Sequence, residues 1–598
     1  MHSRPTPVRA APFLLLTLSS TVLAGPALTV DVLANRHPIS PYIYGMNFAD
    51  AGLAAELQLP VNRWGGNATT RYNWQLDTSN HASDWYFENI PNDNAHPELL
   101  PDGSSSDVFI DANRTSATDT IMTVPLIGWT PKDRNLDCGF SVAKYGAQQS
   151  VDPWHTDCGN GHHTNGTDIT GNDPTDTSVA ITPTFVQQWI GHLVGRYGTA
   201  AQGGVRFYDL DNETALWNST HRDVHPLAEG YDELRDRTWQ YAPAVKAADS
   251  SAKTFGPVAW GWVEYFYSAL DVAAGGSWWD TRPDRRAHGD VPLIDWYLQQ
   301  MRTYEQQHSQ RILDYLDLHY YPQSGEALNP AGDANLQALR LQSTRSLWDP
   351  TYVDVSWIND TVRLIPRMRD WVNTLYPGTK ISITEYNWGG LEDINGALAQ
   401  AEILGIFGRE QLDLATIWSP PTPSQPGAFA FRLYRNYDGA GARYGDITVR
   451  GQSADATQVS VFPAERGDGA LTIVVINKTT TAQTSNLTLN NFTPLGSAKV
   501  YRYSAADLTH IARQADIPST SPISLNLPAS SITLLVIPGP PPGDLNGDGA
   551  VTLADVQQFV NVLLGLDTNP AHIARCDMNR DTLADGRDVA KFVKALAG

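Results

Sequence analysis

The stretch VRFYDLDNE, residues 205–213, sets the first expectation for the fold. An apolar, strand-like run from Val205 to Leu210 ends in polar residues, the last of which is Glu213. The stretch ISITEYNW repeats this pattern, because the run from Ile381 to Thr384 is followed by Glu385. In parallel α/β barrels the functional side chains follow the carboxyl ends of the strands. We therefore predict that both glutamates lie at the same end of one barrel.

Further strand-like segments lie on both sides of these two stretches, separated by long helix-compatible segments. The eight candidates between residues 42 and 426 are Ile43–Met46, Val61–Trp64, Ile121–Ile127, Val205–Leu210, Thr254–Val258, Tyr315–Leu318, Ile381–Thr384 and Leu414–Trp418. Eight strands that alternate with helices predict an α/β fold, a (β/α)8 barrel over residues 42–426. The loop over 128–183 is rich in Gly, Asn, Asp and Thr, and we expect it to form a wall of the site.

The composition changes on both sides of this barrel. Residues 427–537 are rich in Thr, Val, Asn and Ser and contain strand-like runs, which predicts an all-β sandwich. We expect residues 25–41 to add a strand to that sandwich. Residues 538–543 form a Pro/Gly linker, and residues 544–598 form a small α-helical module at the end.

The N-terminus has the features of an export signal. Arg4 and Arg9 precede an apolar run, and a small-residue pattern ends at Ala24. We predict that residues 1–24 are a signal peptide and that the chain is secreted. No later segment has the roughly 18 consecutive apolar residues that a membrane span needs.

The net charge of the chain, −22, excludes two classes of partner. An acidic surface repels nucleic acid and anionic membranes, whereas a neutral polymer is not repelled. The 18 Trp and 24 Tyr suit a site that grips sugar rings, although core packing is the alternative for any one of them.

The chain has three cysteines. Cys138 and Cys158 are each flanked by Asp and Gly, and outside the cytoplasm they would form a disulfide. Two free thiols are the alternative, and Cys576 has no evident partner.

The two glutamates suit the hydrolysis of a glycosidic bond. The leaving oxygen needs a proton donor, and the anomeric carbon needs a carboxylate; when the two carboxyls lie about 5 to 5.5 Å apart, the second attacks directly. We assign Glu213 as the acid/base and Glu385 as the nucleophile, with no cofactor. Glu264 ranks lower because it lies past a strand end, where a helix dipole explains it.

Other strand ends supply candidate substrate-binding residues. These are Arg63, Trp64, Asn67, Asn212, His319, Tyr321, Trp388 and Trp418. An Arg or Tyr would hold the nucleophile, and a Trp would stack on a sugar ring. Packing at the barrel mouth is the alternative for each, and for His319 a hydrogen bond is favoured over a metal.

The last module contains two copies of a calcium-loop pattern. The predicted ligands are Asp544, Asn546, Asp548, Thr552 and Asp555 in the first loop, and Asp577, Asn579, Asp581, Asp585 and Asp588 in the second. Gly549 occupies the sixth position of the first loop, where a sharp turn is needed, but Thr582 occupies it in the second. Two tandem copies predict two structural Ca²⁺ sites, the second of them strained or weaker.

Several long motifs make residues 42–535 resemble glycoside hydrolase family 44, the endoglucanases and xyloglucanases. They are RWGGNATTRYNW (63–74), DWYFENIP (84–91), SVAKYGAQQSVDPW (141–154), ITEYNWGG (383–390) and FRLYRNYDG (431–439). The resemblance implies a barrel with a β-sandwich and a retaining mechanism, with Glu213 as acid/base and Glu385 as nucleophile. One position departs from it: Thr214 stands where we expect a proline.

Residues 544–598 resemble a type I dockerin. This implies a cohesin domain as the partner, on a scaffold or a cell surface. A calcium-stabilised tail without a binding role is the alternative.

These observations together favour a secreted, retaining endo-β-1,4-glucanase acting on β-1,4-glucan polysaccharide. A xylanase or mannanase on the same barrel is the second reading. A non-catalytic carbohydrate-binding scaffold protein is the third, and the presence of both glutamates argues against it.

Overall fold

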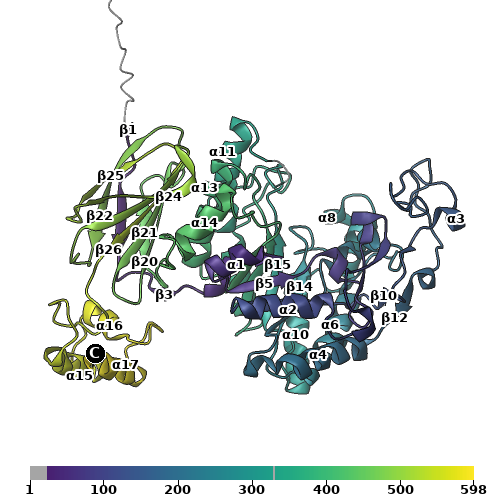
Figure 1. The fold of residues 1–598 in the computed structure, drawn as a ribbon, viewed down its shortest axis with the longest axis horizontal. Helices are drawn as coiled ribbons and strands as arrows, with labels where there is room; N and C mark the ends of the chain where they lie inside the picture. Colours follow the sequence, from purple (N-terminus) through teal and green to yellow (C-terminus); the bar gives the residue numbers. More distant parts are fainter. Residues whose placement is uncertain (1–22, 328–329, 598) are drawn as a thin grey trace, which may run out of the picture.

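The computed structural model describes residues 23–327 and 330–597, which form three parts (Figure 1). A barrel is joined to a β-sandwich, and the C-terminal module lies against the sandwich. Residues 1–22 of the predicted signal peptide lie outside the described residues. The next two residues form β1 (Leu23–Ala24), which pairs with a sandwich strand.

The barrel is a closed ring of eight parallel strands. In chain order they are β4 (Gly45–Asn47), β5 (Val61–Trp64), β9 (Asp119–Val124), β13 (Phe207–Leu210), β14 (Lys253–Ala259), β15 (Tyr315–Tyr320), β16 (Lys380–Tyr386) and β17 (Leu414–Ile417). All eight predicted strands are present, and the predicted (β/α)8 barrel is confirmed.

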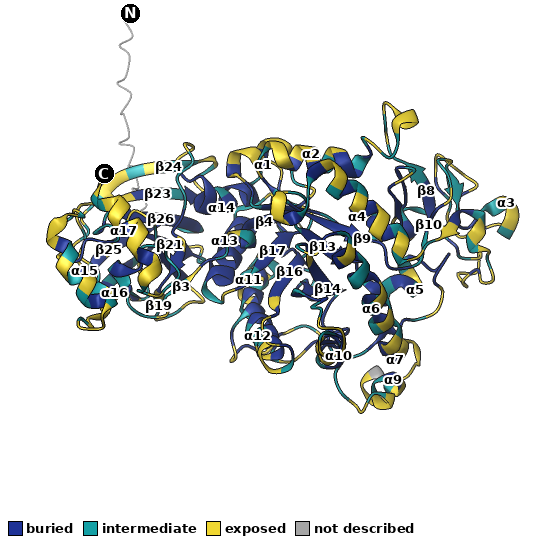
Figure 2. Cartoon of the chain, turned by 90° about the horizontal axis from the view of Figure 1, so that it is seen from below, coloured by how far each residue is buried: buried dark blue, intermediate teal, exposed yellow. Residues whose placement is uncertain are grey.

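Each barrel strand is followed by a helix that packs outside the ring. These helices are α1 (Ala51–Leu57), α2 (Ser105–Thr115), α4 (Pro183–Tyr197), α6 (Tyr231–Ala248), α10 (Leu293–His308), α12 (Leu364–Leu375), α13 (Ile394–Arg409) and α14 (Pro426–Arg435). Figure 2 shows that the strands are buried and that the outer faces of several helices are exposed. Because α14 completes the eighth unit, the barrel ends after Arg435 and not at the predicted residue 426.

The long loop after β9 is folded and carries a disulfide. Its short strand β11 (Asp137–Cys138) pairs with β8 (Glu88–Pro91), and β10 (Trp129–Pro131) pairs with β12 (Ser178–Ala180). Cys138 and Cys158 are bonded to each other. The loop therefore has fixed internal structure.

The sandwich consists of two sheets. The first contains β1, β2 (Leu28–Asp31), β19 (Arg450–Ser453), β22 (Gln483–Asn490) and β25 (Ile523–Leu527). The second contains β3 (His37–Pro38), β18 (Ile447–Thr448), β20 (Val459–Glu465), β21 (Leu471–Asn477), β23 (Ala498–Ser504), β24 (Asp507–Ile517) and β26 (Ser531–Ile537). The segment at residues 25–41 thus supplies a strand to each sheet, and β2 lies between β19 and β22.

The central strands β21 and β26 of the second sheet are buried on both faces. Leu471, Ile473 and Val475 face the interior of the sandwich, whereas Val474 and Ile476 join the barrel core. On the barrel side, the Phe429 ring of α14 stacks on the Tyr503 ring with centroids 4.8 Å apart. Barrel and sandwich consequently share one continuous apolar contact.

The C-terminal module contains α15 (Val556–Leu563), α16 (Pro570–Cys576) and α17 (Val589–Leu596). The Phe559 and Phe592 rings, at equivalent positions of the two repeats, stack with centroids 3.8 Å apart. Arg580 donates to Asp446 Oδ1 (2.5 Å) and to the Glu465 carbonyl (2.8 Å), which ties the module to the sandwich. Among the described residues, no helix has the length and apolar character to cross a membrane.

Candidate active site

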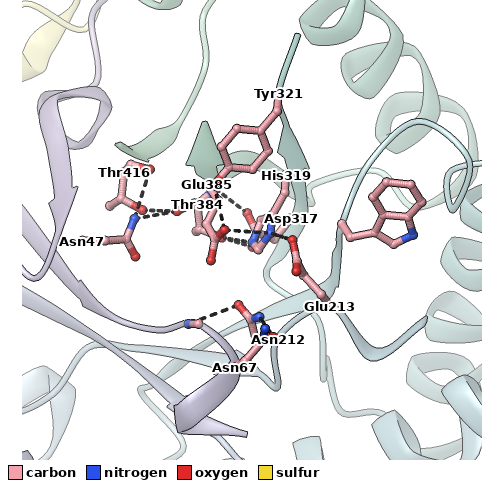
Figure 3. Close-up of polar contacts among 12 residues, drawn as sticks. Asn47, Asn67, Asn212, Glu213, Asp317, His319, Tyr321, Thr384, Glu385 and Thr416 are labelled. Carbon is pink, nitrogen blue, oxygen red and sulfur yellow. Dashed lines mark hydrogen bonds and ion pairs between the residues drawn. The ribbon is translucent and has the colours of Figure 1, made fainter. Parts of the chain in front are cut away.

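Glu213 and Glu385 meet at the carboxyl end of the barrel, as their sequence positions predict (Figure 3). Glu213 follows β13, and Glu385 lies near the end of β16. His319 on β15 is the register partner of Glu385, so that the two side chains leave neighbouring strands at the same level. One carboxyl oxygen of Glu213, one of Glu385 and one ring nitrogen of His319 all lie within 4.8 Å of one another.

Glu213 sits in an unusual turn. Its φ is 49° and that of Asp211 is 74°, in the left-handed region that residues other than glycine rarely adopt. The Glu213 amide donates to the Val258 carbonyl (3.1 Å) on β14. About 15% of the Glu213 side chain is exposed, so that its carboxyl is reachable from outside.

Glu385 is held by two donors. Arg63 Nη1 donates to Glu385 Oε1 at 2.8 Å, and the Tyr321 hydroxyl donates to Oε2 at 2.9 Å. Two hydrogen bonds from different donors fix the orientation of this carboxyl group. The Glu385 oxygens therefore have a defined direction in the site.

Arg63 is the central cation of the site. It is fully buried, and besides Glu385 it donates to Asp209 and, at 2.9 Å, to Asn212 Oδ1. Burial alone would lower the Arg63 pKa, but the charges of Asp209 and Glu385 raise it above its usual value. Because Arg63 is fully buried and four neighbours accept its hydrogen bonds, it supports the nucleophile and is not accessible to a sugar.

His319 links the two glutamates. Its Nδ1 lies 2.8 Å from Glu213 Oε1 and 3.5 Å from Glu385 Oε2, and its Nε2 lies 3.2 Å from Thr384 Oγ1. Burial lowers the pKa of His319 to about 3, so that the ring is neutral. A neutral ring fits a hydrogen-bonding role, as the sequence favoured.

The hydrogen bonds of Thr384 show which ring nitrogen of His319 carries the proton. The Thr384 hydroxyl donates to Asp317, so that Thr384 Oγ1 accepts from His319 Nε2–H. The neutral ring then offers Nδ1 as an acceptor, which suits a Glu213 carboxyl that carries a proton. Burial also raises the pKa of Glu213 to about 7, and Arg63 opposes the shift. Glu213 is thus set to hold a proton near neutral pH.

Asn212 and Asn67 lie beside Glu213. Asn212 Oδ1 accepts from Arg63 and from the Gly66 amide (3.3 Å), and its Nδ2 donates to Asn67 Oδ1 (3.3 Å). Asn67 is partly exposed and also donates to Asp84 Oδ2 at 3.0 Å. Both residues therefore line the site from the β5 side.

The predicted tryptophans separate into two groups. Trp64 and Trp418 are partly exposed, and both contact Phe48, with ring centroids 5.5 and 6.5 Å apart. Trp388 differs, because only 2% of it is exposed and its Nε1 donates to Ser343 Oγ at 3.1 Å. The prediction of Trp388 as a sugar platform is corrected accordingly: the chain turns inward after Glu385, and this ring packs below the site.

Sequence reasoning missed several residues of this network. Asp317 and Asp209 point into the barrel and accept from Thr384 and Arg63. An acidic residue inside an apolar strand, as in YLDLHY, was the available signal for Asp317. Phe48, which is 45% exposed, directly follows β4 and was the one strand-end aromatic of that segment.

A hollow of about 360 Å³ lies near the loops that follow β14 and β15. It is lined mainly by aromatic side chains, including Trp262, Trp279 and Trp357. About half of each of the last two rings is exposed. Trp357 Nε1 donates to Gln323 Oε1 (3.2 Å), and Gln323 donates to the Tyr321 carbonyl (2.8 Å), which connects this hollow to the site.

Residues of metal-ligand type gather in the disulfide loop. Glu88 and Asp152 are buried, His155 is exposed, and one donor atom of each lies within 4.8 Å of the others. Their chemistry fits a divalent cation. Glu213, His319 and Glu385 also cluster, but the Arg63 guanidinium already provides the positive charge there.

The two predicted calcium loops have the expected backbone shape. In the first, Asp544 accepts from the amides of Gly547 and Gly549, both at 2.7 Å. In the second, Asp577 accepts from the Thr582 amide at 2.9 Å, with Thr582 at φ 70°. The loops bring together carboxylate and amide oxygens, the ligands that Ca²⁺ prefers, and Asp544 to Asp555 and Asp577 to Asp588 would hold the ions.

A closed (β/α)8 barrel with two glutamates at its strand ends, one exposed in part and one against an arginine, defines the site of a glycoside hydrolase. Two domain families match the sequence: glycoside hydrolase family 44 over residues 78–324 and the dockerin type I domain over residues 542–597.

Solved structures extend the match to most of the chain. A bifunctional glucanase-xylanase, CelM2 from a metagenome library, is 44% identical, with a TM-score of 0.83, over 86% of this chain and 99% of that one. A Paenibacillus polymyxa xyloglucanase from family 44 is 30% identical, with a TM-score of 0.72 and the same coverage. The chain belongs to glycoside hydrolase family 44.

Two curated relatives are similar over 75% of this chain. They are Endoglucanase A of Paenibacillus lautus, 31% identical, and Beta-mannanase/endoglucanase A of Caldicellulosiruptor saccharolyticus, 30% identical. The chain spans 63% of the length of the first and 34% of the second.

Proposed function

We propose that the chain is a retaining endo-β-1,4-glucanase that hydrolyses internal bonds of a glucan polymer. The observation that carries this proposal is the approach of a Glu213 oxygen to a Glu385 oxygen within 4.8 Å. Retaining enzymes hold their carboxyls about 5 to 5.5 Å apart, whereas inverting enzymes need roughly 6.5 to 9.5 Å to admit a water.

Glu385 acts as the nucleophile in the first step. Its carboxylate attacks the anomeric carbon while Glu213 gives its proton to the leaving glycosidic oxygen. Arg63 and Tyr321 hold the Glu385 side chain in position before attack. The product is a glycosyl ester of Glu385 and a released chain end.

Glu213 acts as a base in the second step. Once Glu385 is an ester its negative charge is gone, which favours the ionised form of nearby Glu213. Glu213 then takes a proton from water, the oxygen attacks the anomeric carbon, and Glu385 is released with the configuration retained.

The names of the relatives support a β-1,4-glucan as the substrate. The family-44 enzyme of P. polymyxa has a structure with xyloglucan, and the P. lautus relative is an endoglucanase. Xylan and mannan are the second candidates, because one relative is named a glucanase-xylanase and another a mannanase/endoglucanase. The exposed Trp279 and Trp357 suit stacking on a neutral sugar chain.

We also propose that the enzyme is secreted and bound to a cohesin domain through its Ca²⁺-loaded C-terminal module. The dockerin match over residues 542–597 and the fold of both loops support this. Pull-down with a panel of cohesins, with and without chelator, tests it.

A substrate panel tests the activity. Reducing-sugar release is measured on carboxymethylcellulose, xyloglucan, xylan and mannan, and NMR follows the anomer formed first. We expect the highest rate on a β-1,4-glucan, with the β-anomer formed first. No release from any polymer would overturn the proposal, and the α-anomer would overturn retention.

A further inference from the structure

The turn that carries Glu213 needs an explanation beyond the two catalytic carboxyls. Glu213 has a φ of 49° and is followed directly by the 3-10 helix η7 (Thr214–Leu216). A left-handed residue other than glycine persists only where its surroundings fix it. Any group that fixes this turn also sets the direction of the Glu213 carboxyl.

A side-chain hydrogen bond fixes the turn immediately after Glu213. Thr214 Oγ1 donates to Glu229 Oε2 at 2.7 Å. Only 1% of Thr214 and 3% of Glu229 is exposed, so that water does not compete for this bond. Thr214 is also the residue at which the sequence departs from the expected proline, a residue that would restrict the backbone covalently.

Glu229 is suited to accept this bond as a neutral acid. In the part of the chain that the structure describes, the Glu229 Oε1 atom is buried and has no hydrogen-bond partner. Burial raises the pKa of Glu229 to about 8, and the Thr214 hydrogen bond opposes the shift. A neutral carboxylic acid retains the carbonyl oxygen that Thr214 needs and adds no charge beside Glu213.

A second buried acid supports the neighbouring strand end. Glu264 Oε2 accepts from the Trp260 amide at 2.8 Å, just beyond β14. The same strand supplies the Val258 carbonyl that receives the Glu213 amide. The turn is thus held by two contacts, one to the backbone of β14 and one to the Glu229 side chain.

We propose that Thr214 and Glu229 are a positioning pair that keeps the acid/base Glu213 aimed at the leaving oxygen. Glu229 is buried and acts only through Thr214. The inference rests on the proposed role of Glu213 as the proton donor.

The test separates proton donation from the other steps. Thr214→Val keeps the shape but removes the hydroxyl, and Glu229→Leu removes the acceptor. On a β-1,4-glucan we expect each to lower kcat/KM about tenfold through kcat, the scale of loss when a catalytic group is slightly misplaced. A 2,4-dinitrophenyl β-cellobioside, whose leaving group needs no proton, should keep its kcat/KM.

Conservative variants and a double mutant complete the test. Thr214→Ser retains the hydroxyl and Glu229→Gln retains the acceptor, so both should stay within about twofold of the parent. The double variant Thr214→Val/Glu229→Leu should lose no more than either single change, since both remove one bond. Thermal melting identifies any variant that has not folded.

Two results would overturn the positioning role: unchanged polymer activity in Thr214→Val, or equal losses on polymer and dinitrophenyl substrate. Glu213→Gln is the separate control for the proton donor. If Glu213→Gln keeps full activity on the polymer, the proposed function itself fails, whatever Thr214→Val shows.

Discussion

At the scale of single residues, the site concentrates charge around one arginine. Arg63 contacts Glu385 and Asp209, and Asp317 lies next in the network. Burial raises the pKa of Asp317 to about 8, with Asp209 adding to the shift, so that Asp317 is neutral near pH 7. The positive charge of Arg63 is therefore not outweighed by a further negative charge on Asp317.

Replacing each glutamate by alanine should give different rescues by azide. In Glu385→Ala, azide can take the place of the nucleophile and give an α-glycosyl azide with a dinitrophenyl substrate. In Glu213→Ala, azide attacks the ester on Glu385 and gives a β-glycosyl azide. NMR of the products checks both, and the same anomer from both variants would contradict the assignment.

The raised pKa of Glu213 predicts the alkaline limit of activity. Glu213 must be protonated to donate, and burial raises its pKa to about 7, so kcat/KM on polymer should fall as pH rises above about 7. The kcat/KM for the dinitrophenyl substrate should not fall in this way. A kcat/KM for the polymer that stays constant up to pH 9 would exclude Glu213 as the acid.

The same shift predicts a stability effect. Unfolded Glu213 loses its proton near pH 4.5, whereas the folded protein holds it to about pH 7, so the Glu213 contribution to stability falls as pH rises between these values. As pH rises through this range, the free energy of unfolding of Glu213→Gln should therefore increase relative to that of the parent protein, by at most about 3 kcal/mol. Urea unfolding at pH 4.5 and pH 8 checks it.

At the scale of elements, the two predicted calcium loops differ in the residue at their sixth position. Gly549 and Thr582 both have positive φ, at 94° and 70°, but only glycine adopts it without strain. In addition, Arg587 Nη1 lies 2.8 Å from Asp581 Oδ2, a predicted ligand of the second loop. We expect the strain and the competing cation to weaken Ca²⁺ binding by the second loop.

We therefore expect two unequal calcium affinities. Calorimetric titration of the chelator-treated protein should resolve a tighter first site and a weaker second one. Thr582→Gly should tighten only the second site, whereas Asp544→Ala should abolish only the first. Two equal sites in the parent protein would contradict this reasoning.

The positions of strands and loops explain how much of the fold and of the candidate site could be predicted from the sequence. The barrel followed from the alternation of segments, and Glu213, Glu385 and Arg63 from polar residues at strand ends. His319 and Thr384 meet because of the register between the neighbouring strands β15 and β16, which is irregular between Asp317 and His319 and cannot be read from the linear sequence. Trp388 was misplaced because a position after a strand end does not reveal whether the ring faces the site or, as here, is buried with its Nε1 bonded to Ser343.

At the scale of the whole molecule, the barrel and the sandwich meet at a glycine. A Cβ on Gly405 of α13 would lie 2.5 Å from the Phe462 ring on β20. On α4, by contrast, a Cβ on Gly191 would meet no atom within 4 Å. The close approach of helix and sheet thus depends on the absence of a side chain at residue 405.

Alanine at these two glycines should have opposite effects. Gly405→Ala should destabilise the protein by about 1 to 3 kcal/mol through overpacking. Gly191→Ala, the matched control, should stabilise it by about 0.5 to 1 kcal/mol because alanine favours the helix. Thermal unfolding checks both, and a neutral Gly405→Ala would show that the sheet can move away from the helix.

The order of the strands has a consequence for biosynthesis. Asp31 of β2 pairs with Arg450 of β19, and these residues stand 419 positions apart. Because a ribosome makes the chain from its N-terminus, β2 is synthesised early. Its partner strands β19 and β22 are synthesised only after the entire barrel. Leu28 and Val30, both fully buried in the end, stay exposed for that time. The nascent chain therefore carries an unpaired apolar strand that a chaperone can recognise until the sandwich closes.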